Sequence, residues 1–285
     1  MAKTRPSVAD KRRTFGRLHE AGCFAIPNPW DIGSALYLQS LGFKALATTS
    51  SGFAWSQGRA DGRVARERVL AHLGELVAAT DVPLNADFEN GFAADSAGVG
   101  DSVRRCVETG VAGLSIEDST GNASTPLFEL DAAVERIRAA RRAIDHAGGD
   151  TLLIARAECF LVGRPDLDMT IGRLKAYADA GADCLYAPGI RTAEQIRAVV
   201  AAVRPKPVNL LVSSPGGLTM QQIAGLGVRR VSVGGALARA AWGGFMRASR
   251  QIAEQGIFDG LAGAASGEEL DARFSEERSG DQEPV

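Results

Sequence analysis

Acidic side chains recur at the ends of apolar runs in this sequence, and they are the residues best suited to do chemistry. Asp87 and Glu89 close the third run, Glu117 ends the fourth, and Asp61 lies in the segment after the second. Carboxylates gathered in one place repel one another unless a cation or a proton holds them together. An oxygen-only set without His or Cys suits a hard ion, so the pattern favours a site for Mg²⁺, with Mn²⁺ as an alternative.

A cation and a hydroxyl-rich stretch accompany these acids. Arg156 ends the fifth apolar run, and the second run ends in Thr49, Ser50 and Ser51. A guanidinium and backbone N–H groups stabilise negative charge that develops on a substrate oxygen. Any one acid taken alone is more simply a helix N-cap or an ion-pair partner, and we expect the cap role of Asp31. Three acids at consecutive strand ends favour a site over three separate coincidences.

The elements that must position these side chains alternate along the chain. Eight short apolar runs without strict alternation predict buried parallel strands at 23–27, 45–49, 83–87, 113–117, 152–156, 184–187, 208–212 and 230–234. Helical periodicity occupies 31–41, 65–80, 96–109, 131–147, 168–180, 192–203, 219–226 and 236–255. Gly110 and Gly181 follow two of these helices, where a left-handed C-cap is needed. We therefore predict an α/β protein with a (β/α)8 barrel, and an open doubly wound sheet is the alternative.

Length and composition limit the number of domains and the classes of partner that we expect. The 285 residues form a single barrel domain over 1–265, followed by an acidic tail over 266–285 that holds at most a short helix at 270–274. With 32 Lys and Arg against 34 Asp and Glu, no positive field favours nucleic acid as a partner. Four scattered cysteines and the lack of a long apolar stretch predict a cytoplasmic protein that is not membrane-bound.

Several segments together resemble the isocitrate lyase/phosphoenolpyruvate mutase superfamily. They are Asn28-Pro-Trp-Asp31-Ile-Gly-Ser-Ala35, the Thr-Thr-Ser-Ser-Gly52 strand end, Asp61, Asp87-Phe-Glu89-Asn-Gly91-Phe, Ile116-Glu117-Asp118 and Ile154-Ala-Arg156. Their order over about 24–241 is more specific than any one of them. The resemblance implies a barrel whose last helix is exchanged with a neighbouring subunit, which gives a homodimer or homotetramer. It also implies Mg²⁺ and a 2-oxo acid, or its enolate, as the small-molecule ligand.

The resemblance also implies roles for individual acids. Asp87 matches the main direct metal ligand, and Glu89 stands where the family has a second Asp. Asp61 and Glu117 match acids that hold metal-bound waters, which places them in the metal set and among the catalytic residues.

The substrate set follows from the same resemblance. Thr49, Ser50 and Ser51 match the residues that bind the substrate carboxylate and oxo group. Arg156 matches the catalytic arginine that clamps the substrate, and Asn209 falls near a polar position on the seventh strand.

The chain departs from the family in the segment 118–129, which contains no Lys, Cys or His. Isocitrate and methylisocitrate lyases carry a Lys-Lys/Arg-Cys-Gly-His signature there, and mutases acting on phosphonates carry Lys and Asn, of which Asn122 alone remains. Strand six is followed by Ala187-Pro-Gly189 rather than Glu or His. Loss of CO2 requires no base, so we expect a Mg²⁺-dependent carbon–carbon lyase or decarboxylase for a small 2-oxo (di)carboxylic acid.

Two alternatives remain open. Glycines in 213–217 and 234–235 suggest phosphate binding and P–C bond chemistry, although tight turns are the better explanation of them. A non-catalytic barrel that binds 2-oxo acids is the other. We expect no catalytic role for His19, His72 or His146, and we expect Glu158 to mark a helix start rather than to contact Arg156.

Overall fold

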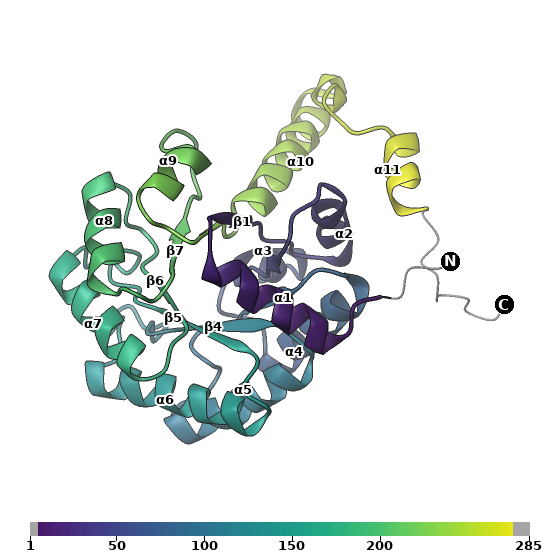
Figure 1. The fold of residues 1–285 in the computed structure, drawn as a ribbon. Helices are drawn as coiled ribbons and strands as arrows, with labels where there is room; N and C mark the ends of the chain where they lie inside the picture. The colour runs from purple at the N-terminus through teal and green to yellow at the C-terminus, as the bar shows by residue number, and fades with distance from the viewer. Residues whose placement is uncertain (1–4, 276–285) are drawn as a thin grey trace.

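Eight parallel strands form the centre of the computed structural model, which describes residues 5–275 (Figure 1). The strands are β1 Phe24–Ile26, β2 Leu46–Ala47, β3 Leu84–Asp87, β4 Gly113–Glu117, β5 Leu152–Arg156, β6 Cys184–Tyr186, β7 Val208–Leu211 and β8 Arg230–Ser232. Each lies inside the range expected from its apolar run.

The order of the strands decides between a barrel and an open sheet. The strands pair in the order β1-β8-β7-β6-β5-β4-β3-β2, so the first and last strands of the chain are neighbours. The backbone N–H of Ala47 donates to the carbonyl of Pro27 at 3.1 Å, which joins the end of β1 to β2. The prediction of a (β/α)8 barrel is confirmed.

Helices follow the strands as the periodicity indicated. They are α2 Ile32–Ser40, α4 Arg66–Ala79, α5 Ser96–Glu108, α6 Leu130–His146, α7 Leu167–Asp179, α8 Ala193–Ala202, α9 Met220–Gly225 and α10 Ala236–Gln255. Asp31 caps α2, because its carboxylate accepts from the N–H of Ser34 at 2.7 Å. Gly110 and Gly181 both have positive φ, as their places after helices require.

Two helices of the described chain were not expected. α1, Val8–Glu20, packs Phe15 into a cluster with Ile26, Ala45 and Ala112 next to the starts of the strands. The sequence feature that could have predicted α1 is the capping box made by Ser7 and Asp10. The other, α3, spans Ser50–Ser56 between the second predicted strand and the helix predicted at 65–80, where no helix was expected.

The barrel interior contains polar groups as well as apolar ones. Asn85, Ser115, Asn209, Arg230 and Ser232 are all buried on its strands. Apolar side chains between strands and helices form the main core, which includes Leu73, Leu114, Leu153, Val199 and Val231. The polar interior leads toward the carboxyl ends of the strands, where chemistry takes place in barrels of this kind.

The chain after β8 leaves the barrel. Figure 1 shows α10 projecting away from the strands, and α11, Gly267–Phe274, returns beside α2. A short helix was expected at 270–274, and α11 starts three residues earlier; 276–285 of the expected acidic tail lie outside the described residues. Within residues 5–275, none of the helices combines the length and the apolar character that crossing a bilayer requires.

Candidate active site

A cavity of about 180 Å³ opens at the carboxyl ends of the strands. Six residues predicted from the sequence line it: Thr49, Ser50, Ser51, Asp61, Asp87 and Arg156. The structure therefore brings together side chains from β2 and its following segment, β3 and β5, as expected for neighbouring strands of a parallel barrel.

Arg156 is the centre of the charge arrangement. Its Nη1 donates to Asp87 at 2.8 Å, its Nη2 lies 3.2 Å from a Glu117 carboxylate oxygen, and its Nε donates to Glu158 at 2.8 Å. The side chains of all four residues are less than one-fifth exposed. One guanidinium thus holds three acids in fixed positions, and its five N–H donors make this geometry possible.

Asp87 is held from a second side by the polar end of β2. Its other carboxylate oxygen accepts from the backbone N–H of Ser50 at 2.9 Å, and its own N–H donates to the Thr48 hydroxyl at 2.8 Å. Thr49 is the N-cap of α3 and accepts from the N–H of Gly52. The segment Thr49–Ser51 therefore begins α3 at the cavity wall. In this first turn the backbone N–H of Ser50 points toward Asp87.

Two further acids lie where burial opposes their charge. Burial, and then the nearby charges of Asp87 and Asp61, raise the pKa of Glu89 to about 8. Burial also raises the pKa of Asp61, while a hydrogen bond from the Ser50 side chain acts in the opposite direction. Glu89 has a positive φ of 46°, a backbone conformation that non-glycine residues adopt at a cost.

The predicted metal ligands fit a hard cation in their chemistry. Asp61, Asp87, Glu89 and Glu117 offer oxygen alone, and burial raises the pKa of Glu117 as it does those of Asp61 and Glu89. Among the described residues, however, no three acids stand close enough to form a ready-made cation site. In the described structure, the positive charge of Arg156 offsets the negative charges of Asp87 and Glu117.

Glu158 contacts Arg156, although we had expected it to mark the start of a helix. It does not begin a helix; its carboxylate accepts from Arg156, and its N–H donates to Asp118 at 2.8 Å. Asp118 is buried and also accepts from Tyr177 at 2.6 Å and Arg173 at 3.1 Å. This second ion pair connects α7 to the loop after β4, and it holds Glu158 against Arg156.

Asn209 occupies a different place from the other predicted substrate residues. It is fully buried, and its carboxamide bonds to Ser232 at 2.9 Å and to Arg230 at 2.7 Å. Ser232 and Arg230 line the cavity with Tyr186, and the sequence analysis singled out none of the three. Their spacing in the sequence could have indicated this: Arg230 and Ser232 lie two residues apart on one strand and therefore face the same side.

The three histidines lie away from the strand ends, in α1, α4 and α6, as expected. His72 stacks on Phe53 with ring centroids 3.8 Å apart. His19 is buried at the barrel base beside Phe15 and Phe24.

The sequence profile described as phosphoenolpyruvate phosphomutase matches residues 15–253 of this chain. The chain belongs to this family. A Burkholderia cenocepacia J2315 lyase/mutase candidate is 48% identical, with a TM-score of 0.90 over 94% of this chain and 97% of that one. An uncharacterized Mycobacterium tuberculosis protein, Rv1998c, is 32% identical over 78% of this chain and 81% of its own. An oxaloacetate decarboxylase from Chromohalobacter salexigens is 30% identical over 79% of each chain.

These similarities place the chain in a superfamily that contains both phosphomutases and lyases. The resemblance to the isocitrate lyase/phosphoenolpyruvate mutase superfamily is thereby confirmed. A solved structure of a 2,3-dimethylmalate lyase shares the fold, and fold alone does not fix the reaction.

Proposed function

We propose that this member of the phosphoenolpyruvate mutase family is a Mg²⁺-dependent carbon–carbon lyase or decarboxylase for a small 2-oxo (di)carboxylic acid. The observation that carries the proposal is the pairing of Arg156 with Asp87 in the wall of a small polar cavity at the strand ends. An arginine beside a cation-binding acid is the charge pattern that an anionic 2-oxo acid needs. The oxaloacetate decarboxylase relative supports the same class.

The residues of the chain would divide the work between the metal and the substrate. Asp87 would hold the Mg²⁺ directly, and Asp61, Glu89 and Glu117 would complete the site directly or through water. When bound, the ion would supply positive charge to the carboxylate and oxo oxygens of the substrate. Arg156 would stabilise the negative charge that grows on the oxo oxygen when the bond breaks, and the Thr49–Ser51 segment would orient the carboxylate.

Decarboxylation fits the loop that follows β4. The segment between Asp118 and Glu129 contains no His, Cys or Lys, so it offers no imidazole, thiol or amine for acid–base catalysis. The loop's polar side chains bond within the loop, as Thr120 does to the carbonyl of Thr125 and Ser124 does to Asn122. Since CO2 leaves without a base, this reaction requires the least of the loop.

The glycines that favoured P–C chemistry have a packing explanation at one position. A Cβ on Gly235 would stand 2.6 Å from the Ser51 hydroxyl and 3.2 Å from the Trp55 ring. Glycine at 235 therefore lets the start of α10 approach α3 closely, with or without a phosphate. The P–C alternative stays a prediction that the substrate panel tests.

The test is a substrate panel with purified protein and Mg²⁺. Oxaloacetate, substituted malates, methylisocitrate and phosphonopyruvate are incubated separately, and products are followed by ¹H and ³¹P NMR. We expect pyruvate from oxaloacetate, and no phosphate from phosphonopyruvate. Phosphate release would favour the P–C alternative, and tight 2-oxo acid binding without any turnover would favour a non-catalytic barrel.

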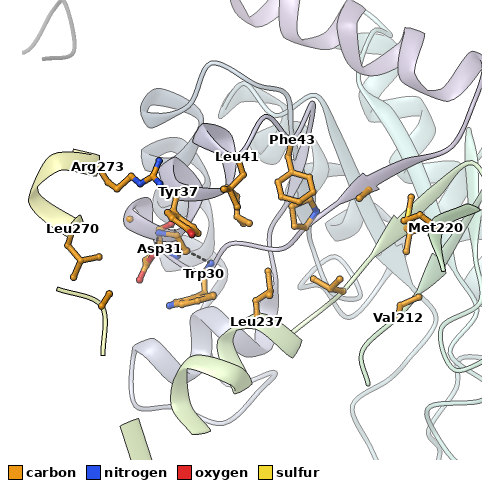
Figure 2. A pocket seen from close by; sticks show the side chains of 18 of the residues that line it. Trp30, Asp31, Tyr37, Leu41, Phe43, Val212, Met220, Leu237, Leu270 and Arg273 are labelled. Carbon is orange, nitrogen blue, oxygen red and sulfur yellow. Dashed lines mark hydrogen bonds between the residues drawn. The ribbon is translucent and has the colours of Figure 1, made fainter. Parts of the chain in front are cut away.

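We also propose that α10 is exchanged between two copies of this chain. A groove of about 930 Å³ lies outside the barrel between α2 and α9, and Figure 2 shows Trp30, Leu41, Phe43 and Met220 around it. The projecting α10 exposes Trp242 and Phe245, the latter 63% exposed. A helix with an uncovered apolar face and a groove of matching character on the same chain fit each other in a symmetric dimer.

The test is the mass of the protein in solution. Trp242→Glu with Phe245→Glu places two charges on the apolar face, and light scattering should show a monomer where the parent chain is a dimer or larger. Arg250→Glu on the same helix is the control and should keep the parent mass. A monomeric parent chain would contradict the exchange.

A further inference from the structure

Tyr186 has no role in the proposed function, yet it lines the same cavity as Asp87 and Arg156. It ends β6 and is only 7% exposed. The Arg156 guanidinium carbon lies 5.1 Å from the centre of its ring. A phenol is both a donor and an acceptor, so what it does depends on the groups behind it.

A directed chain of hydrogen bonds leads from the barrel interior to this phenol. Arg230 can only donate, and its Nε donates to the Asn209 carboxamide oxygen at 2.7 Å. The Asn209 amide nitrogen must then point away from Arg230, and it donates to the Ser232 hydroxyl at 2.9 Å. Ser232, having accepted this bond, has its own O–H left to donate, and a side-chain hydrogen bond from Ser232 opposes the rise in the pKa of Tyr186.

The direction of this chain fixes the state of Tyr186. Because the phenol oxygen accepts from Ser232, its own hydrogen remains available to a group in the cavity. Burial raises the pKa of Tyr186 to about 12, so the phenol keeps this hydrogen at neutral pH. Nearby positive charge from Arg156 opposes that rise and would stabilise the phenolate left after donation.

Arg230 is a buried cation whose partners are amide groups and an imidazole rather than acids. It is 2% exposed, and the bonds that it makes go to the amides of Asn209 and Asn85 and to His19. No acid in residues 5–275 pairs with it within 4.0 Å. Its charge therefore remains uncompensated at the start of the chain that ends at Tyr186, and this strengthens each bond in turn.

We propose that Tyr186 is the proton donor of the reaction, positioned by Ser232, Asn209 and Arg230. This role rests on the proposed function. In the decarboxylation of oxaloacetate, the bond between C3 and C4 breaks, CO2 leaves, and the electron pair forms the C2–C3 double bond of an enolate. The double-bond electrons then take the proton from the Tyr186 hydroxyl to C3, which restores the C2 carbonyl of pyruvate. Water returns a proton to the phenolate.

Tyr186 supplies a proton donor that the segments after β4 and β6 do not offer. The loop after β4 lacks the acid–base residues found in other lyases of the superfamily, and β6 is followed by Ala187-Pro-Gly189. Tyr186 lies one residue before that segment, on the inward side of the strand. It provides a donor without help from the loop.

The experiment is deuterium exchange into the methyl group of pyruvate, because exchange requires proton transfer at C3 without any C–C bond breaking. The protein is incubated with pyruvate and Mg²⁺ in D2O, and the methyl signal is followed by ¹H NMR. Tyr186→Phe should slow both exchange and pyruvate formation from oxaloacetate by about 100-fold or more. Its affinity for oxalate, which resembles the enolate, should stay within about threefold of the parent value.

Tyr37→Phe is the matched control, because it removes the same hydroxyl from an exposed residue of α2. It should leave exchange unchanged. If the parent protein neither exchanges pyruvate nor decarboxylates oxaloacetate, the proposed function is wrong and the role of Tyr186 falls with it. If the parent is active and Tyr186→Phe keeps its rate, only the assignment of Tyr186 is wrong.

The positioning role of Ser232 has its own test. Ser232→Ala should lower kcat about tenfold and leave KM unchanged, because a positioning residue acts through Tyr186 and not on the bound substrate. Ser232→Thr keeps a hydroxyl and should restore most of the rate. An equal loss in both variants would show that Ser232 matters for packing alone and would overturn the hydrogen-bond chain.

Discussion

Two arginines lie at opposite ends of the same barrel interior, Arg156 largely buried and Arg230 fully buried, and they are surrounded by different groups. Arg156, near the open end of the cavity, pairs with three acids. Arg230, deeper in the barrel, bonds to two asparagines and lies beside His19. Charge pairing fixes the positions of acids around a ligand site, whereas an unpaired charge fixes the direction in which neutral groups donate. The barrel uses both effects within one cavity.

The sharpest way to test this difference is to remove each charge and measure the free energy of unfolding. Arg156→Met leaves one buried and two largely buried carboxylates without their cation and should destabilise the protein by about 3–5 kcal/mol. Arg230→Met leaves only neutral amide oxygens without a donor and should cost about 1–3 kcal/mol. Urea unfolding followed by circular dichroism measures both. Equal losses would show that the two arginines are compensated alike.

Removing an acid instead of the arginine tests the ligand site at the open end. Asp87→Ala should lower the affinity for Mg²⁺ in the presence of oxalate by more than about 100-fold, because the other acids cannot replace a direct ligand. Titration calorimetry measures this affinity. Asp95→Ala, which removes the N-cap of α5, is the control and should keep the parent affinity. Unchanged binding in Asp87→Ala would contradict the assignment of this residue.

Acid should affect the interior around Arg230 through His19. Burial, and then the charge of Arg230, lower the pKa of His19 to about 3 from an ordinary 6.5. The unfolded chain therefore binds a proton below pH 6.5 that the folded chain refuses, and stability falls as the pH falls. Between pH 6.5 and 5 the loss should be about 2 kcal/mol from this residue.

The measurement for His19 is urea unfolding at several pH values. His19→Gln should remove this part of the slope, while His146→Gln, on the outer helix α6, should not. An identical pH slope in His19→Gln and the parent would show that His19 is not kept neutral.

The smallest expected effect comes from giving Arg230 the acid that it lacks. Asn209→Asp places a carboxylate at the oxygen that now accepts from Arg230, so unfolding should change by less than about 1 kcal/mol. The same change removes the amide that donates to Ser232, and turnover should fall about tenfold. Turnover equal to that of the parent would show that the direction of the chain does not matter.

Much of the fold followed from local patterns. The strands at 113–117 and 152–156 were predicted with their observed ends, because buried parallel strands are short apolar runs between helices. Asp31 as the cap of α2 followed from its position alone. α3 was missed because Ser50 and Ser51 favour turns in isolation, and the cap at Thr49 together with packing of Phe53 against His72 makes them helical.

The sequence by itself placed Asp87, Glu117 and Arg156 at the carboxyl ends of neighbouring parallel strands, and side chains at those ends must arrive at one rim. It could not show which of the acids would pair with Arg156, or that Glu158 would do so rather than begin a helix. Only the tertiary structure placed Arg230 beside Asn85 and His19, which are 145 and 211 residues away along the chain. The direction of the hydrogen bonds toward Tyr186 depends on those contacts, and local spacing carries no record of them.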